Sequence, residues 1–285
     1  MVSTDYFESY MSFVKKTYPR FYKECYQTYL EKDKRYFKEI INAIYKLFLH
    51  ISILKEVSSK NTYFLEETEK ITYSILFLIP TNDSYSINSF SRALSESVLR
   101  LILLNNKNNT NLSQSDISKM SFNNIKKEID KNNFLFSRKN KFVYLYNLFA
   151  VSSKKLHSPG ISIANHTFFD EQFDEKYELK KMSSVFQQIN KIFLEFIIPD
   201  VFELASEDIS LSNSIKIKKL LSRKEFNLYK KYLSKNQRWI MVNIEVFQKV
   251  NKKDVSFIKE TIASILGSKF IILHRIINYN LSPSI

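Results

Sequence analysis

The chain has 285 residues, a formal net charge of +14 at pH 7 and a hydrophobic content of 44%. This apolar content excludes a disordered chain and is enough for a sizeable packed core. Glycine occurs only twice, at Gly160 and Gly267, which excludes Gly-rich phosphate loops, dinucleotide-binding turns and nucleophile elbows, because each needs several glycines close together. Barrels and sandwiches also need glycine in their turns, so we expect an all-α multi-helix bundle.

The first predicted elements are helices with apolar residues three and four positions apart. From Tyr6 to about Lys60 a short helix leads, through a break at Pro19, into a long one. Tyrosines and lysines alternate along this stretch, for example in "KKTYPRFYKECYQ". An aromatic core stripe flanked by lysine stems is favoured over a face that stacks bases and binds phosphate. A third helix is predicted from Glu66 to Leu78, ending before Pro80.

The middle of the chain is also predicted to be helical. Asp83, Ser84 or Ser86 can cap the first helix of this part, and the Asn-rich loop "NNKNNTNLSQSD" follows that helix. The last helix stops before Pro159, because proline disfavours helical geometry in the residue that precedes it. The predicted helices are Ile87 to Leu104, Ile117 to Lys131 and Arg138 to Leu156.

The last part of the chain begins with a long predicted helix from about Glu175 to Ile198, which Pro199 ends or kinks. The segment "RWIMVNIEVFQKV" fits either a strand or a buried helix. We place a domain boundary after Gly160, giving a helical domain over 1–160 and a C-terminal helical region over 161–285 that either stands apart or packs with it as one unit. Shorter helices are predicted at Ile215–Leu221, Arg223–Leu233, Asp254–Leu266 and Lys269–Ile277.

Several classes of site are excluded by residue counts and spacing. Cys25 is the only cysteine, which excludes an internal disulfide framework and a Cys-based zinc site. The four histidines have no paired spacing, so we expect no bound metal and no cofactor. The longest apolar runs are far shorter than the roughly 18 residues of a membrane span, and the N-terminus lacks the pattern of a signal peptide. We expect a cytoplasmic protein without a membrane partner.

One candidate site is a row of charged residues in "SFSRALSESVLRLILL". Arg92, Glu96 and Arg100 are four residues apart, so on a helix they form a ladder on one face. Leu99 and Leu103 flank this ladder. A solvated ladder of ion pairs is slightly favoured over a half-buried Arg-Glu-Arg site, in which each charge would need a partner.

A second candidate site lies in "YLYNLFAVSSKKLHSPG", where His157 ends an apolar helix. Tyr146 and Ser153 share the helix face of His157, and Lys154 and Lys155 lie within its reach. A histidine at the edge of a buried face can act as a general acid or base near neutral pH. The alternative, favoured for an isolated histidine, is that His157 interacts with the last carbonyl groups of the helix.

Taken together, these two stretches resemble the HEPN superfamily, whose helical domains are common in bacterial toxin and phage-defence systems. Arg92 and Glu96 match its Arg-x-x-x-Glu helix, and Tyr146, Ser153 and His157 fall on or near its second motif helix. The resemblance covers about 70 residues, from Ser86 to Gly160. It implies a HEPN-like core with additional C-terminal helices, RNA or another nucleic acid as the partner, and either a homodimer or a complex with a defence-system partner protein.

The chain departs from the HEPN nuclease signature, in which an arginine precedes the histidine by four to six residues. The nearest arginine before His157 is Arg138. Either Arg92 or Arg100 replaces the missing arginine from the neighbouring helix, or the domain binds RNA without cutting it. In the active form, His157 would be the acid and base for attack by the RNA 2′-hydroxyl, and Arg92, Arg100 and Lys154 would hold the phosphate. Glu96 would orient the arginines.

The net charge agrees with a polyanionic partner. The 43 Lys and Arg residues exceed the 29 Asp and Glu residues, which favours nucleic acid at long range, although an AT-rich coding sequence would give the same excess. We therefore expect an antiviral-defence or toxin component that binds RNA, with metal-independent endoribonuclease activity if the incomplete motif is functional. The alternatives are a non-catalytic nucleic-acid-binding or regulatory subunit of a separate enzyme, and a purely structural interaction protein.

Overall fold

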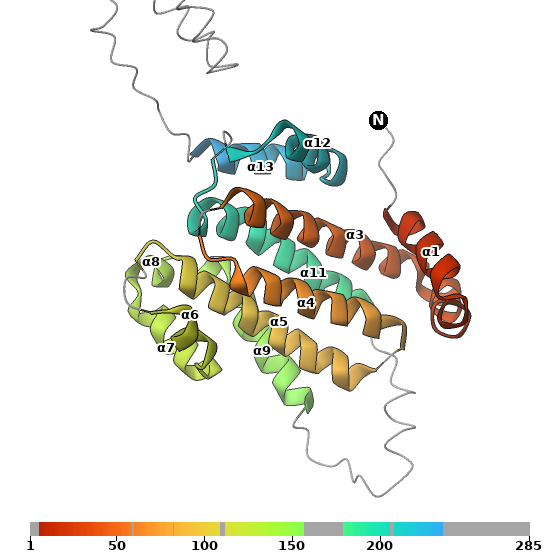
Figure 1. The fold of residues 1–285 in the computed structure, drawn as a ribbon. Coiled ribbons are helices and arrows are strands. Elements are labelled where there is room, and N and C mark those ends of the chain that lie inside the picture. The colour runs from red at the N-terminus through yellow and green to blue at the C-terminus, as the bar shows by residue number, and fades with distance from the viewer. Residues whose placement is uncertain are drawn as a thin grey trace, which may run out of the picture. The chain divides into compact units, whose positions relative to one another are not determined.

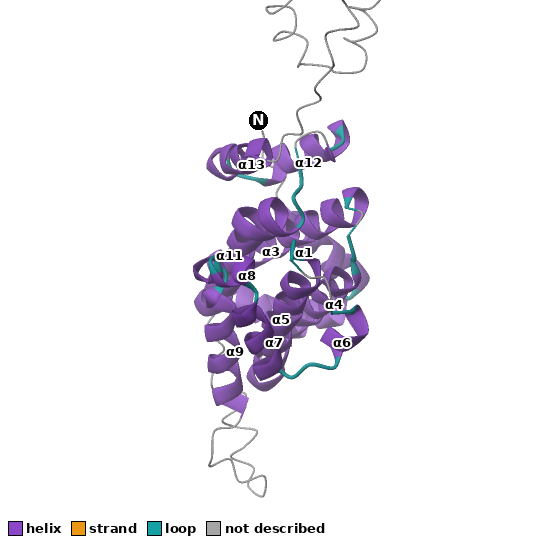
Figure 2. Ribbon diagram, turned by 90° about the vertical axis from the view of Figure 1, so that its left-hand side faces the viewer, coloured by secondary structure: helices purple, strands orange, loops and turns teal. Residues whose placement is uncertain are grey.

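The computed structural model describes residues 6–58, 60–81, 83–108, 112–156, 179–205 and 208–235, without the side chains of 28–32. Every regular element in these ranges is a helix (Figures 1 and 2), so the predicted all-α multi-helix bundle is confirmed. The described helices belong to one compact unit, Met1–Gln237. None of them combines the length and the apolar character that crossing a membrane requires.

The N-terminal helices follow the predicted break at Pro19. The ring of Pro19 occupies the first turn of a new helix, where its missing N–H costs no hydrogen bond. A short π-helical segment then leads into the longest described helix, whose backbone leaves helical geometry only at Asp33. These elements are α1 (Tyr6–Thr17), α2 (Pro19–Phe21), the π-helical segment Tyr22–Tyr26 and α3 (Gln27–Val57).

The next two helices, α4 (Tyr63–Leu78) and α5 (Ser84–Asn105), form an antiparallel pair. Asp83 caps α5, because its carboxylate accepts a hydrogen bond from the backbone N–H of Ser86 at 2.9 Å. The prediction of Asp83 as one of three possible caps is therefore confirmed. The helix begins before the predicted start at Ile87, because the cap lies farther upstream.

The predicted single helix from Ile117 to Lys131 is wrong, because the chain forms α6 (Gln114–Ser118) and α7 (Phe122–Lys131) instead. Ser121 separates them: its Oγ accepts a hydrogen bond from the N–H of Asn124 at 3.4 Å and starts a new helix. The next predicted helix also begins later than Arg138. The elements there are α8 (Asn133–Phe136), a 3₁₀ turn (Lys139–Lys141) and α9 (Val143–Leu156).

The C-terminal part of the described unit starts with α11 (Leu179–Ile192), which continues into a π-helical segment, Phe193–Val201. Pro199 lies inside this wider segment, so it modifies the helix and does not end it. Two further helices follow, α12 (Leu211–Leu220) and α13 (Arg223–Lys235). The predicted start near Glu175 and the elements predicted after residue 235 lie outside the described residues.

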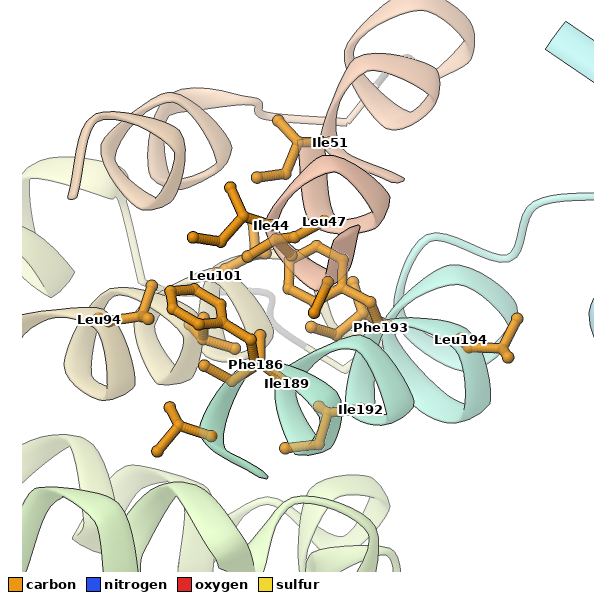
Figure 3. Close-up of a cluster of buried hydrophobic side chains, with 14 of the residues drawn as sticks. Ile44, Leu47, Ile51, Leu94, Leu101, Phe186, Ile189, Ile192, Phe193 and Leu194 are labelled. Atoms are coloured by element: carbon orange, nitrogen blue, oxygen red, sulfur yellow. The ribbon is translucent and has the colours of Figure 1, made fainter. Parts of the chain in front are cut away.

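The core is built around α3, α5 and α11, whose apolar faces meet (Figure 3). Ile44 of α3, Leu94 of α5 and Phe186 of α11 are all fully buried. Within this core α3 contacts α11, and α5 also contacts α4 and α9. Helices on either side of the predicted boundary after Gly160 thus pack together in one unit, and the two helices with the candidate motifs, α5 and α9, are neighbours.

Candidate functional site

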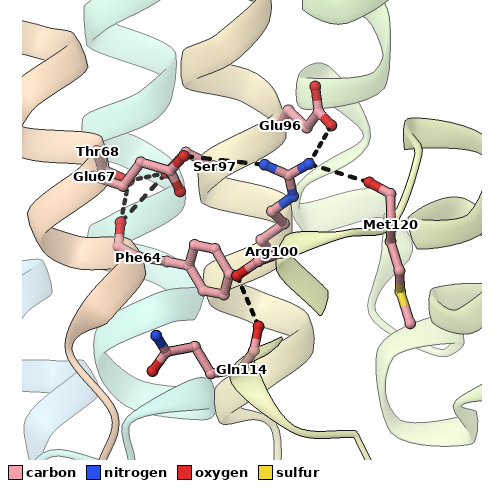
Figure 4. A network of polar contacts seen from close by, with 9 residues as sticks. Phe64, Glu67, Thr68, Glu96, Ser97, Arg100, Gln114 and Met120 are labelled. Carbon is pink, nitrogen blue, oxygen red and sulfur yellow. Dashed lines mark hydrogen bonds and ion pairs between the residues drawn. The ribbon is translucent and has the colours of Figure 1, made fainter. Parts of the chain in front are cut away.

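The charged ladder of α5 is divided between two environments, and its C-terminal pair is largely buried. Arg100 Nη2 donates hydrogen bonds to Glu96 Oε1 at 2.7 Å and to the Met120 carbonyl at 3.1 Å. Its Nη1 lies 4.0 Å from Glu67 Oε1 (Figure 4). The side chains of Arg100 and Glu96 are only 16% and 18% exposed. The solvated ladder favoured by the sequence is therefore wrong for this pair.

The consequence is that Arg100 joins helices inside the protein. Its guanidinium connects α5 with α4 through Glu67 and with the turn before α7 through Met120. The Arg100 Nε atom is buried with no hydrogen-bond partner among the described residues. A guanidinium held in this way by two carboxylates and a carbonyl has little charge left to offer a ligand.

Arg92, two turns earlier on α5, has a different environment. Its Cζ atom lies 4.8 Å from the ring centroid of Phe149 on α9, in a cation–π contact. Phe149 in turn stacks on Phe122 of α7, with ring centroids 3.5 Å apart and planes 3° from parallel. No carboxylate of the described residues forms an ion pair with Arg92, so its charge is not neutralised there.

A shallow hollow of about 330 Å³ lies beside Arg92 at the junction of α5, α7 and α9. The hydroxyl of Ser153, which borders it, is buried and has no hydrogen-bond partner among the described residues. Arg92 and Ser153, which the sequence placed on two neighbouring motif helices, are therefore brought together, whereas Glu96 and Arg100 do not line the hollow. Its lining residues are Arg92, Ser121, Phe122, Asn123, Phe149 and Ser153.

The N-terminus of α7 also borders this hollow, through Ser121, Phe122 and Asn123. The first N–H groups of an α-helix have no partner within the helix. Together with the positive end of the helix dipole, they favour an anion at this position. The hollow thus combines a guanidinium, a hydroxyl and a helix N-terminus, which is a set of groups suited to binding a phosphate or another oxyanion.

Tyr146, another predicted binding residue of α9, is partly buried against the core. Its hydroxyl is buried without a partner among the described residues, and its ring contacts Phe122 and Phe142 edge to face. Burial raises the pKa of Tyr146, and the negative charge of Asp130 raises it further. The phenol therefore stays protonated at neutral pH and does not act as a base.

The remaining predicted residues lie at or beyond the end of α9. Lys154 and Lys155 are exposed in its last turn, and each takes part in an interaction. His157 lies outside the described residues. The described residues contain no group of three or more His, Cys, Asp or Glu side chains placed to hold a metal ion.

Sequence reasoning missed the contributions of α7 to this hollow. Phe122 and Asn123 were predicted to lie inside a continuous helix. The pattern Ser-x-x-Asn at Ser121 is a signal for a helix start that could have been recognised. The contact of Phe149 with Arg92 depends on the packing of α5 against α9, which no local sequence pattern displays. Comparison of the chain with known protein families, curated proteins and solved structures finds no match.

Proposed function

We propose that this protein binds RNA and holds one backbone phosphate in the hollow between α5, α7 and α9. One observation carries the proposal: the guanidinium of Arg92 has no carboxylate partner among the described residues and lies beside the unpartnered hydroxyl of Ser153. A phosphate would supply the anion that Arg92 lacks and the acceptor that the Ser153 hydroxyl lacks. The N-terminus of α7 would add favourable electrostatics at the same position.

RNA is the phosphate ligand that the surroundings of the hollow favour. The net charge of +14 increases the rate of encounter with a polyanion. The half-buried rings of Phe122 and Phe149 adjoin the cation, and an aromatic ring beside a phosphate-binding group is a common feature of single-strand recognition. The exposed lysines at the end of α9, Lys154 and Lys155, lie on the helix that forms one wall of the hollow.

Cleavage is the further step implied by the resemblance to HEPN domains of bacterial defence and toxin systems. In that step His157 removes the proton from an RNA 2′-hydroxyl, the 2′-oxygen attacks the adjacent phosphorus, and the bond to the 5′-oxygen breaks as His157, acting as the acid, returns the proton to that oxygen. Arg92 would stabilise the developing negative charge. The buried ion pair of Arg100 with Glu96 supports a positioning role for these two residues and argues against direct phosphate binding by Arg100.

The binding proposal is tested by comparing two arginines of one helix. Fluorescence anisotropy with a labelled single-stranded RNA would be measured for the wild type, Arg92→Gln and Arg100→Gln, after circular dichroism has verified that each variant is folded. Loss of one phosphate contact weakens binding by about tenfold and lowers the salt slope by about 0.7. We expect this effect for Arg92→Gln and less than about a twofold change for Arg100→Gln. Equal affinities for wild type and Arg92→Gln would refute the site.

Cleavage is tested separately with the same RNA. If the chain is a nuclease, the wild type produces fragments in the presence of a metal chelator, and His157→Ala produces none while keeping its affinity. If RNA is bound with no turnover, the chain is a non-catalytic binding subunit. The missing arginine before His157 favours this alternative. Cleavage by His157→Ala at the wild-type rate would eliminate the catalytic form.

A further inference from the structure

A second surface with an unusual composition lies at the opposite end of α4 from Tyr63. It is a groove of about 290 Å³ formed by α1, α2, the π-helical segment Tyr22–Tyr26, α3 and the end of α4. Nine of its eleven lining residues are aromatic. We refer to this surface as the aromatic groove.

The rings at the rim of the aromatic groove are exposed. Phe13 and Tyr18 are 55% and 56% exposed, and Tyr73 and Phe77 are 53% and 61% exposed. Large rings with more than half of their surface in water contribute little to folding, because the burial of apolar area is what stabilises a fold. A contiguous group of such rings is typical of a surface that binds a ligand or a partner.

The two exposed rings on α4, Tyr73 and Phe77, are held in defined orientations by rings beneath them. Phe77 stacks on Phe21 with a centroid distance of 5.0 Å and an interplanar angle of 11°. Tyr73 stacks on Phe48 at 4.3 Å and 26°. Tyr73 and Phe77 therefore each have one face covered by protein, and they are already ordered before a ligand arrives, which lowers the entropy cost of binding.

The helices that form the aromatic groove also have an excess of positive charge. Lys15, Lys16, Arg20 and Lys23 are exposed, no acidic residue lies between positions 15 and 23, and one exposed acidic residue, Glu24, follows Lys23. Lys15 Nζ lies 5.8 Å from the ring centroid of Tyr22. Within the described residues, none of the four forms an ion pair with a carboxylate. The aromatic core stripe that the sequence favours is correct for Tyr26 and Phe37, which are buried. It is not correct for the exposed rings at the rim of the aromatic groove.

We propose that the aromatic groove binds unpaired RNA bases, with Lys16, Arg20 and Lys23 contacting the phosphates between them. This inference rests on the proposed RNA-binding function and adds a second contact, separate from the hollow at Arg92. Each nucleotide of a single strand offers one flat ring and one negative charge, which matches exposed rings flanked by cations. An apolar partner helix would match the rings but would leave these cations without counter-charges.

The test uses substitutions of exposed groups in the full chain, so folding is little affected. Tyr73→Ala/Phe77→Ala removes two rings of the groove. Tyr63→Ala is the matched control, because Tyr63 is 46% exposed at the other end of the same helix. Lys16→Gln/Arg20→Gln/Lys23→Gln removes the charges, and Arg92→Gln reports on the first site. Affinity for a labelled single-stranded RNA and for a duplex of the same length is measured in a salt series.

We expect the two-ring variant to bind single-stranded RNA at least about tenfold more weakly than the wild type, since stacking on one ring accounts for about fivefold or more in affinity and the variant removes two rings. Tyr63→Ala should match the wild type. Removing three phosphate contacts should lower the salt slope by about 2. The duplex, whose bases are already stacked and paired, should bind more weakly to the wild type and show little sensitivity to the two-ring variant.

Failure of this inference can be distinguished from failure of the proposed function. If Arg92→Gln weakens binding while the two-ring variant binds as well as Tyr63→Ala, the groove is not an RNA site and the hollow remains one. If the wild type does not bind RNA, both proposals fail. Analytical ultracentrifugation provides one more outcome: if the two-ring variant loses a dimer that the wild type forms and its RNA affinity is unchanged, the groove holds a second copy of the chain, which also overturns the inference.

Discussion

Replacing His50 by leucine should remove a specific part of the pH dependence of folding. His50 lies on α3 and is only 1% exposed. Its ring lies between Phe193 and Tyr229, with centroid distances of 6.3 Å and 6.4 Å and interplanar angles of 13° and 10°. Neither ring nitrogen has a hydrogen-bond partner among the described residues. This environment disfavours the charged imidazolium.

The magnitude follows from the pKa of His50. Burial lowers this pKa from 6.5 to about 4, although the negative charge of Glu225 opposes the change and Lys46 adds to it. Between these two values the unfolded chain binds a proton that the folded chain does not, so stability falls as the pH falls. The complete effect is about 3 kcal/mol, and about 2 kcal/mol of it should be lost between pH 7 and pH 5.

The assay is urea unfolding followed by circular dichroism at pH 7 and at pH 5, for the wild type and His50→Leu. Carboxylates and the other three histidines titrate in both proteins, so the difference between the two pH dependences isolates His50. We expect the loss of stability between pH 7 and pH 5 to be about 2 kcal/mol smaller in His50→Leu. If both proteins lose the same free energy, the neutral buried state of His50 is refuted.

Three further predictions concern contacts that hold the bundle together. Asp83→Ala should lower the free energy of unfolding by about 1 kcal/mol in urea titrations, since α5 loses its cap; an unchanged midpoint would contradict this. Arg100→Ala should lower the free energy of unfolding by about 2 kcal/mol in the same assay, because it leaves buried groups such as Glu96 without a partner. An unchanged free energy of unfolding would show that the contacts of Arg100 do not stabilise the fold. Burial by itself would raise the pKa of Glu225, but hydrogen bonds from Lys46 and Ser222 outweigh it and lower the pKa. The Lys46–Glu225 ion pair should therefore stabilise the fold above pH 4.5 and lose this contribution as the pH falls further. In thermal melts, the melting temperature of Glu225→Gln should depend less on pH in the acid range than that of the wild type.

The fold could be predicted largely from apolar periodicity and from the near absence of glycine. The break at Pro19 and the cap at Asp83 follow from local backbone chemistry, which the sequence displays directly. The helix interruption at Ser121 was missed because apolar residues continue across it at helical spacing. The hydroxyl of Ser121 accepts a hydrogen bond from the backbone N–H of Asn124, and this local cap starts a new helix in spite of the apolar periodicity.

The candidate site was predictable only in part. Arg92 and Ser153 lie on two helices that the sequence paired, and they line one hollow. The difference between Arg92 and Arg100 was not predictable, because it depends on Glu67 and Met120, which the fold brings to Arg100 from other parts of the chain. Arg92 and Arg100, at equivalent positions of one ladder, thus differ in role. The charge of Arg92 is available to a ligand, whereas that of Arg100 is paired inside the protein.

Hydrogen–deuterium exchange of the full chain, with and without single-stranded RNA, tests the central claim most directly. The first N–H groups of α7, at Phe122 and Asn123, have no partner within the helix and should exchange quickly in the free protein. A phosphate in the hollow should slow their exchange, together with that of the last turn of α9 around Ser153. Saturation with RNA that leaves both segments exchanging as in the free protein would contradict the proposed site.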